Sequence, residues 1–239
     1  MSVKCSDGRA RTGGRIGVQR SHASIHLGCA LLALALLAGH DNAQGREDCM
    51  LMMHSDGTYE NGYAWEADGC VPPEFGAFAE RYEGRWEVLQ VILDLTSITW
   101  PIDPRADIYI WGDDAGAPGS VLLMVSNVPM GYIPQWPWVG RNVIELPEPL
   151  CVDADWWVGF WGRWELAGVE FFIAADLDGP GGGFPATKIA SGQGYPTGWQ
   201  NVSVRWGPTA ALGIGAEVDS CPPTPVESET WGSIKALYR

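Results

Sequence analysis

The chain has 239 residues, a formal net charge of −14 at pH 7 and 13 tryptophans. This acidity excludes a basic surface that would bind phosphate backbones, so we expect no nucleic-acid partner. Hydrophobic residues make up 46% of the chain and charged residues 18%, which is too apolar for a disordered protein. The length suits one domain of sandwich or barrel size.

The N-terminal segment has the pattern of an export signal. A basic leader precedes an apolar run at residues 27–39, and small residues follow it. This run has the length of a signal-peptide core and is shorter than the ~20 residues that span a bilayer. We therefore predict a signal peptide over residues 1–43 and a secreted, extracellular or cell-surface protein without a membrane span after cleavage. Cleavage near Ala43 is expected, Ala38 and Gly39 are alternative positions, and a buried N-terminal helix is the alternative interpretation.

Removal of the leader leaves four cysteines, an even number in a compartment that we expect to be oxidising. We predict the disulfides Cys49–Cys70, which would close a short loop, and Cys151–Cys221, which would join the end of the domain to its middle. Four cysteines allow three pairings, and four free thiols are the alternative. The chain has no Cys-x-x-Cys motif, and His54 is the one histidine after the leader, so a zinc site is disfavoured.

Short extended segments without intervening helical patterns follow the leader. They are rich in β-branched and aromatic residues and are bounded by Gly, Pro, Asp or Asn. In one of them Asp107, Tyr109 and Trp111 alternate with Ile108 and Ile110, so the two sets face opposite sides of a strand. The predicted strands cover residues 86–95, 106–112, 120–127, 142–147, 155–164, 169–176, 199–206 and 211–218. They predict an all-β fold, an antiparallel two-sheet β-sandwich of jelly-roll-like type, in one domain over residues 50–219.

The connection at residues 112–119 is dense in glycine, aspartate and proline. These residue types favour turns, so we expect an exposed hairpin loop there.

Tryptophans supply the candidate ligand-binding residues. Trp136 and Trp138 flank a proline in a connection, where exposure is expected, and Trp161 and Trp164 are further candidates in the next aromatic segment. Planar rings on a rigid sheet suit stacking against sugar rings, while acidic and amide groups bind the hydroxyls. Because most aromatic residues are buried, a place in the core is the alternative interpretation for each of them.

Both faces of the strand predicted at residues 155–164 carry large aromatic residues. Trp157 and Trp161 share one face, and Trp156 and Phe160 share the other. One set can fill the core, so the other must be covered by a neighbouring segment, a partner or a ligand.

An acidic, glycine-rich turn follows the strand predicted at residues 169–176. Asp176 and Asp178 alternate ahead of several glycines, and carboxylates beside a flexible loop suit calcium. The third acidic position and the distal glutamate of the twelve-residue calcium loop are missing. A turn whose aspartate caps the backbone is the favoured interpretation, and calcium bound by Asp176 and Asp178 is the alternative.

The chain ends in a proline-rich linker and a terminal tail at residues 220–239. Prolines stiffen the linker and prevent it from continuing a sheet. Beyond them Trp231, Ile234 and Leu237 recur at a spacing of three, which predicts a short amphipathic helical tail. Docking of the tail on the sandwich and a sorting or anchoring signal are the two interpretations.

A succession of aromatic and turn-rich motifs runs along the mature chain. The motifs are DGTYENGYAW at 56–65, VPPEFGAFAE at 71–80, Trp111 followed by DDAGAPGSVL at 113–122, WVGFW at 157–161 and TWGSIKALYR at 230–239. This succession resembles secreted bacterial β-sandwich proteins of unknown function. The resemblance implies an extracellular or surface-attached jelly-roll-like module with a terminal export or attachment tail. The chain is also loosely similar to carbohydrate-binding accessory domains, a likeness that does not establish a ligand.

Two function classes fit these observations. The first is a non-catalytic extracellular or cell-surface module for adhesion, carbohydrate binding or structural assembly. Its expected partners are glycans, cell-envelope components or other copies of the chain. The second is a secreted glycan-active hydrolase that uses a carboxylate pair. No nucleophile motif accompanies His54, so we predict no catalytic residue and no enzyme.

Overall fold

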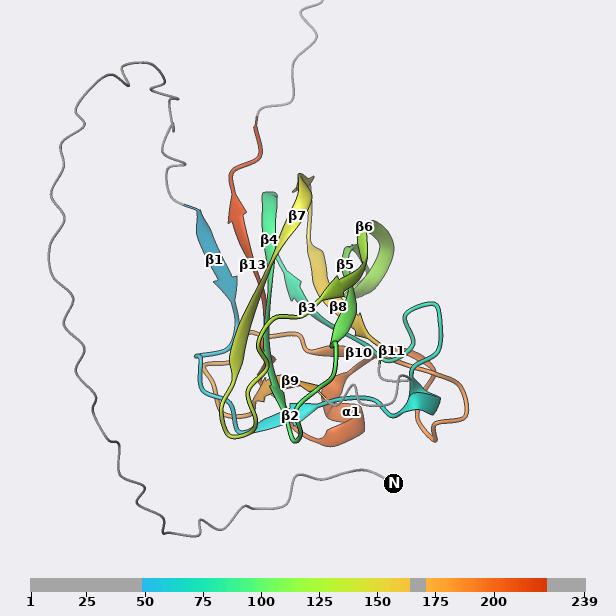
Figure 1. The fold of residues 1–239 in the computed structure, drawn as a ribbon. Coiled ribbons are helices and arrows are strands. Elements are labelled where there is room, and N and C mark those ends of the chain that lie inside the picture. The colour runs from blue at the N-terminus through green and yellow to red at the C-terminus, as the bar shows by residue number, and fades with distance from the viewer. Residues whose placement is uncertain (1–48, 164–170, 223–239) are drawn as a thin grey trace, which may run out of the picture. The chain divides into compact units, whose positions relative to one another are not determined.

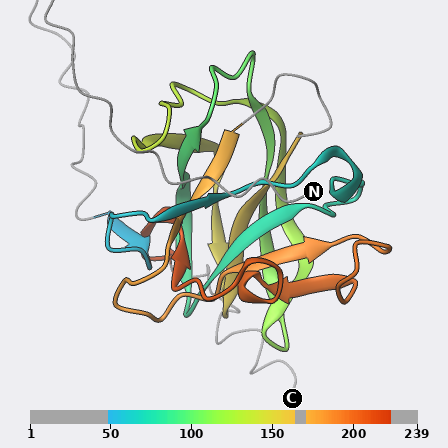
Figure 2. The same cartoon turned by 90° about the horizontal axis from the view of Figure 1, so that it is seen from below.

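A computed structural model of the protein describes residues 49–163 and 171–222. These residues form thirteen strands, one 3₁₀-helix, η1 (Ala67–Gly69), and one short α-helix, α1 (Val202–Trp206). The paired strands make two antiparallel sheets (Figures 1 and 2). This arrangement confirms the predicted all-β fold with two sheets.

The first sheet has seven strands. Its order is β1-β13-β4-β9-β12, with β2 paired to β9 and β7 paired to β4. The strands are β1 (Met50–Met53), β2 (Asn61–Tyr63), β4 (Trp86–Ser97), β7 (Gly140–Val152), β9 (Phe171–Asp176), β12 (Ala211–Leu212) and β13 (Ile214–Asp219). β4 organises this sheet because it pairs with β13, β7 and β9.

The second sheet has six strands in the order β11-β10-β3-β8-β5-β6. The strands are β3 (Ala77–Tyr82), β5 (Arg105–Asp114), β6 (Ala117–Pro129), β8 (Trp156–Gly162), β10 (Ala186–Ile189) and β11 (Gly198–Asn201). Its two longest strands, β5 and β6, form a hairpin at one edge.

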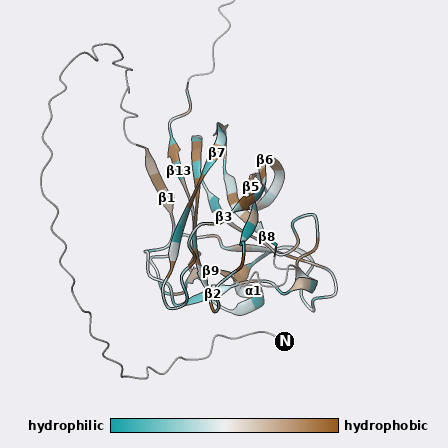
Figure 3. Ribbon diagram, viewed as in Figure 1, coloured by the Kyte–Doolittle hydropathy of each residue, from teal (hydrophilic) through white to brown (hydrophobic). Residues whose placement is uncertain are grey.

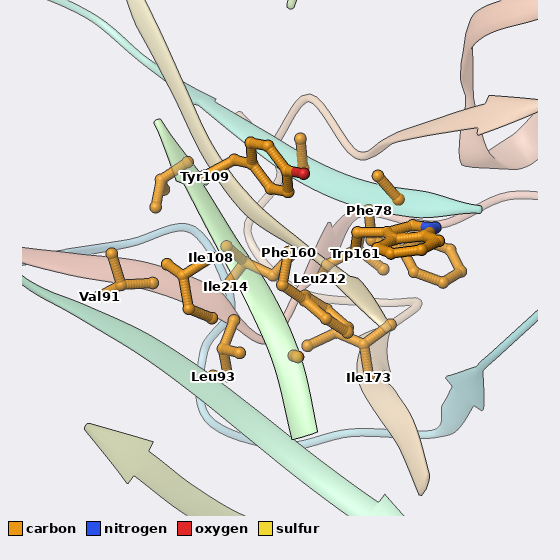
Figure 4. Close-up of a cluster of buried hydrophobic side chains, with 14 of the residues drawn as sticks. Phe78, Val91, Leu93, Ile108, Tyr109, Phe160, Trp161, Ile173, Leu212 and Ile214 are labelled. Atoms are coloured by element: carbon orange, nitrogen blue, oxygen red, sulfur yellow. The ribbon is translucent and has the colours of Figure 1, made fainter. Parts of the chain in front are cut away.

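The hydrophobic core lies between the two sheets. Ile108 and Phe160 of the second sheet point toward Val91, Leu93 and Ile214 of the first (Figure 4). All five side chains are buried, and hydrophobic residues are concentrated in the strands (Figure 3). Full burial of one such side chain stabilises the fold by about 1.5–3 kcal/mol.

A second aromatic layer covers the opposite face of the second sheet. Tyr109, Trp111, Trp157 and Trp161 lie there and are buried as well. The rings of Tyr109 and Trp111 stack with centroids 5.0 Å apart, and the ring of Trp199 in β11 meets Trp111 edge-on at 5.3 Å. The predicted alternation of faces in β5 and β8 is therefore confirmed. The neighbouring strand β11 helps to cover the aromatic residues of this face.

The predicted hairpin loop at residues 112–119 is shorter in the structure. β5 continues to Asp114 and β6 begins at Ala117. The two residues between them, Ala115 and Gly116, have φ values of 53° and 88°. Positive φ at both central residues matches the tight type I′ turn that joins twisted strands, so most of the predicted loop belongs to the strands.

The predicted strand at residues 199–206 is correct only over residues 199–201, which belong to β11. At Asn201 the chain turns into α1. The Asn201 side chain accepts a hydrogen bond from the amide of Ser203 and so caps this helix. A local cap therefore ends a segment whose composition alone favours a strand.

Several predicted features lie outside the described residues. They are the signal peptide at 1–43, Trp164 and the part of the tail at 223–239. Within the described ranges, neither helix has the length and hydrophobicity of a transmembrane helix.

Candidate functional site

Exposed apolar side chains gather on two loops at one end of the sandwich. The loops are residues 98–104, between β4 and β5, and residues 130–139, between β6 and β7 (Figure 1, lower end). We call their five large exposed hydrophobic residues the aromatic patch. The members of the patch are Ile98, Trp100, Ile102, Tyr132 and Trp138.

Three aromatic rings of the patch are mostly in water. The exposed fractions are 63% for Trp100, 70% for Tyr132 and 74% for Trp138. The rings of Trp100 and Tyr132 contact each other with centroids 6.2 Å apart, so the two loops form one surface. Large aromatic side chains are usually buried, and an exposed group of them marks a binding surface.

Backbone hydrogen bonds hold the two loops together beneath the patch. The amide of Ser97 donates to the carbonyl oxygen of Pro134 at 3.0 Å, and the amide of Trp136 donates to the carbonyl oxygen of Ser97 at 2.9 Å. The Thr96 hydroxyl donates to the carbonyl oxygen of Trp138 at 2.8 Å. Because the end of β4 fixes the loops, the patch is organised before any ligand binds, which lowers the entropic cost of binding.

The predicted ligand-binding tryptophans differ in how far they are exposed in the structure. Trp138 is on the patch, whereas Trp136 is half-buried beside it. Trp161 is only 7% exposed, and its Nε1 donates to the carbonyl oxygen of Phe75 at 2.9 Å. The structure therefore does not support Trp161 as a ligand-binding residue, because both faces of β8 are covered. Trp164 is outside the described residues.

Trp100 and Tyr132 were not among the residues predicted to bind a ligand. Trp100 precedes Pro101, as Trp136 precedes Pro137, and this shared Trp-Pro context is the signal that would have found it. Tyr132 has no such context. Its place beside Trp100 follows from the pairing of the two loops, and Ser97 and Gln135 form a β-bridge between them.

The structure brings the two predicted metal ligands together and adds a third carboxylate. Oxygens of Glu60, Asp176 and Asp178 lie within 4.8 Å of one another. Asp176 is fully buried, and its carboxylate accepts hydrogen bonds from the amides of Asp56, Asp178 and Gly179 at 3.0, 3.1 and 2.6 Å. These bonds match the favoured interpretation, an aspartate that caps the turn. Calcium binding stays a prediction.

His54 takes part in packing at the edge of the first sheet. Its Nε2 lies 2.8 Å from the carbonyl oxygen of Arg81. Its ring stacks on Tyr82 with centroids 4.7 Å apart and an interplanar angle of 5°. Both contacts give His54 a structural role.

Cys151 and Cys221 lie beside each other as thiols. The pKa of Cys151 is raised to about 11, first by desolvation and then by its hydrogen bond and charge interaction with Cys221. Cys70 is buried, and its thiol donates to the carbonyl oxygen of Gly162 at 2.8 Å. The structure thus brings together the predicted pair Cys151–Cys221. The predicted pair Cys49–Cys70 stays a prediction.

A small cleft opens between the β5–β6 turn and β11. Its volume is about 110 Å³, and the rings of Trp157, Phe184 and Trp199 and the amides of Gln200 and Asn201 line it. A cavity of about 150 Å³ is known to take one benzene molecule. The cleft is smaller than this, so the exposed aromatic patch is the better candidate for an extended ligand.

No family model matches the chain, and no curated protein matches it. The chemistry of the aromatic patch is therefore the main guide to function. The two loops carry one charged residue, Asp103, whose carboxylate pairs with Arg105 at 2.9 Å, so the surface suits a neutral ligand with apolar faces.

Proposed function

We propose that the protein is a non-catalytic carbohydrate-binding module that acts in adhesion outside the cell. The exposure of Trp100, Tyr132 and Trp138 on one end of a rigid sandwich carries this proposal. Sugar rings with equatorial hydroxyls present apolar C–H faces. Such faces stack on aromatic rings, and stacking removes both surfaces from water.

The shape and charge of the patch favour a neutral, extended polysaccharide. The patch is an exposed surface on two loops, so it suits the face of a chain or of a packed polysaccharide. The whole protein carries a formal charge of −14, which would repel an anionic glycan. Neutral β-linked polysaccharides avoid this repulsion.

Two further features support a location outside the cell. The predicted signal peptide directs the chain to export. A disulfide between the neighbouring residues Cys151 and Cys221 would suit an oxidising compartment.

The hydrolase alternative has less support. Glycoside hydrolases hold two carboxyl groups about 5–5.5 Å or about 6.5–9.5 Å apart on either side of the scissile bond. In the acidic group of Glu60, Asp176 and Asp178, the buried Asp176 is engaged by three backbone amides. A carboxylate held in this way organises a turn and is not available to a substrate.

A panel of polysaccharides tests the proposal. The probes are microcrystalline cellulose, insoluble chitin, soluble laminarin and anionic polygalacturonate. We expect binding to at least one neutral probe and weaker binding to polygalacturonate. Trp138→Ala should weaken binding about ten-fold, which corresponds to about 1.4 kcal/mol. The control is Phe184→Ala, which removes a ring that is 45% exposed in the cleft, away from the patch, and should leave binding unchanged. Absence of binding to every neutral probe would overturn the proposal.

A further inference from the structure

A charged pair borders the aromatic patch. Asp103 follows Ile102, a member of the patch, in the loop between β4 and β5, and Arg105 is the first residue of β5. The Nε of Arg105 donates to Oδ2 of Asp103 at 2.9 Å. Both side chains reach water, since 66% of the Asp103 side chain and 33% of the Arg105 side chain are exposed. The same loop therefore presents a carboxylate and a guanidinium next to the patch.

Hydrogen bonds to the backbone of β6 fix this pair in place. The Nη1 of Arg105 donates to the carbonyl oxygen of Asn127, near the end of β6, at 3.3 Å. Asn127 is itself held, because its amide donates to the Asp107 carboxylate at 2.6 Å and its Oδ1 accepts a bond from Nη1 of Arg163 at 3.0 Å. These bonds orient the guanidinium of Arg105, and the guanidinium orients the Asp103 carboxylate.

The backbone of Asp103 has an unfavourable conformation. Its φ is 47°, and the next residue is Pro104. Positive φ is uncommon for residues other than glycine, and a following proline restricts the backbone further. An exposed ion pair adds little stability, so the fold does not explain why this conformation is kept. Strained residues gather at ligand-binding positions, where the strain helps to place a functional group.

The pair keeps capacity for further hydrogen bonds. Within the described residues, no group bonds Oδ1 of Asp103 or Nη2 of Arg105. Oδ1 can accept a hydrogen bond from one hydroxyl group, and Nη2 can donate a hydrogen bond to a second hydroxyl group. Two adjacent hydroxyl groups on one sugar ring match this acceptor and this donor.

We propose that Asp103 and Arg105 bind the adjacent hydroxyl groups of a β-1,4-linked glucan whose neighbouring rings stack on the aromatic patch. This inference rests on the proposed function and specifies its ligand. A β-1,4-linked glucan leaves the 2- and 3-hydroxyl groups of each internal ring free. A β-1,3 linkage occupies the 3-oxygen, and chitin carries an acetamido group in place of the 2-hydroxyl group. A site built to bond both hydroxyl groups discriminates against chains that lack one of them.

Spacing and charge both fit this ligand. Trp100 lies three residues before Asp103, so their Cα atoms are at most about 11 Å apart. One oligosaccharide chain can therefore contact the ring of Trp100 and the charged pair together. The charges of Asp103 and Asp107 balance those of Arg105 and Arg163. This local balance suits a neutral chain and gives a uronic acid no net attraction.

Isothermal titration calorimetry of the exported chain tests the inference with three soluble probes, cellohexaose, laminarihexaose and chitohexaose. The wild-type protein should bind cellohexaose at least about ten-fold more tightly than either other probe. Asp103→Gly removes the carboxylate, and glycine tolerates the positive φ at this position. This variant and Arg105→Gln should each weaken cellohexaose binding at least about ten-fold and leave laminarihexaose binding unchanged, because only cellohexaose uses both groups.

Asp153→Gly is the matched control. It breaks the exposed pair of Arg85 and Asp153, whose Nε and Oδ1 atoms are 3.1 Å apart. Arg85 precedes β4 and the patch follows β4, so this pair lies toward the opposite end of the strand and its loss should not change binding. Circular dichroism and thermal unfolding check that each variant is folded.

Two results would overturn the inference while the proposed function stands. The first is wild-type binding of laminarihexaose or chitohexaose as tight as that of cellohexaose. The second is a preference for cellohexaose that both Asp103→Gly and Arg105→Gln leave unchanged. Absence of binding to all three probes and to every neutral polysaccharide would overturn the inference and the proposed function together.

Discussion

Glu80 in β3 is a fully buried carboxyl group that connects three parts of the fold. Its Oε1 accepts a hydrogen bond from the amide of Leu212 in β12 at 2.6 Å, and its Oε2 accepts one from the amide of Phe184 at 2.9 Å. Burial raises the pKa of Glu80 to about 8, although the two amide donors act in the opposite direction. The protonated form therefore prevails at neutral pH in the folded protein.

The raised pKa of Glu80 predicts a pH-dependent stability. The unfolded pKa is about 4.3, so between about pH 4 and pH 8 the folded state holds more protons than the unfolded state. The contribution of Glu80 to stability is complete below this window and is lost as the pH rises to about 8, by at most about 1.4 kcal/mol per pH unit. Glu80→Gln cannot ionise. Urea unfolding across the window should show the wild-type protein losing stability relative to this variant. Parallel pH profiles would contradict the account.

Asp176 supports a second prediction. Asp176→Asn replaces one carboxylate oxygen by a donor that faces backbone amides, so we expect a loss of about 2–3 kcal/mol in the free energy of unfolding. Asp178→Asn is the matched control, because Asp178 is exposed and should cost less than about 0.5 kcal/mol. Denaturant unfolding with calcium and with EDTA measures both variants. The turn-capping role predicts the same loss in both conditions. A loss seen with calcium alone would assign Asp176 to a metal site instead.

At the scale of elements, Cys151 lies near the end of β7 and Cys221 follows β13. A disulfide between them would close a loop of about 70 residues and stabilise the fold by about 4 kcal/mol through the unfolded state. We expect non-reducing peptide mapping of the exported protein to find this bond. Cys151→Ser should lower the free energy of unfolding by about 4 kcal/mol, and only under oxidising conditions. Equal stability of variant and wild type under oxidising conditions would rule the bond out.

The strands with regular alternation were predictable from sequence. β5 and β8 carry aromatic or β-branched residues on both faces, so their burial follows from composition. β3 was missed because Glu80 and Arg81 interrupt its apolar pattern. Glu80 is nevertheless buried, since backbone amides of distant segments satisfy its oxygens. These long-range partners have no local signal in the sequence.

The candidate site was predictable only in part, because contacts between distant segments leave no local signal in the sequence. The proline context of Trp138 indicated an exposed ring. Trp100 and Tyr132 are brought together by hydrogen bonds between two loops about 30 residues apart in the sequence. Trp161 is buried by segments that fold over β8, and its Nε1 donates to the carbonyl oxygen of Phe75. The sequence around Trp161 does not indicate this burial.

In the molecule as a whole, the aromatic patch lies on the loops at one end of the sandwich, and the cleft beside the β5–β6 turn is a separate surface. A polysaccharide chain that stacks on the patch therefore needs no group from the cleft.

One set of binding isotherms shows whether the aromatic patch binds a polysaccharide. The neutral probe bound best by the wild-type protein is titrated with three proteins: the wild type, the triple variant Trp100→Ala, Tyr132→Ala, Trp138→Ala, and the control Phe184→Ala. The patch predicts that the triple variant, folded by circular dichroism, loses at least about a hundred-fold in affinity, or about 2.7 kcal/mol. The control should bind like the wild type. Unchanged binding by the triple variant would contradict the account.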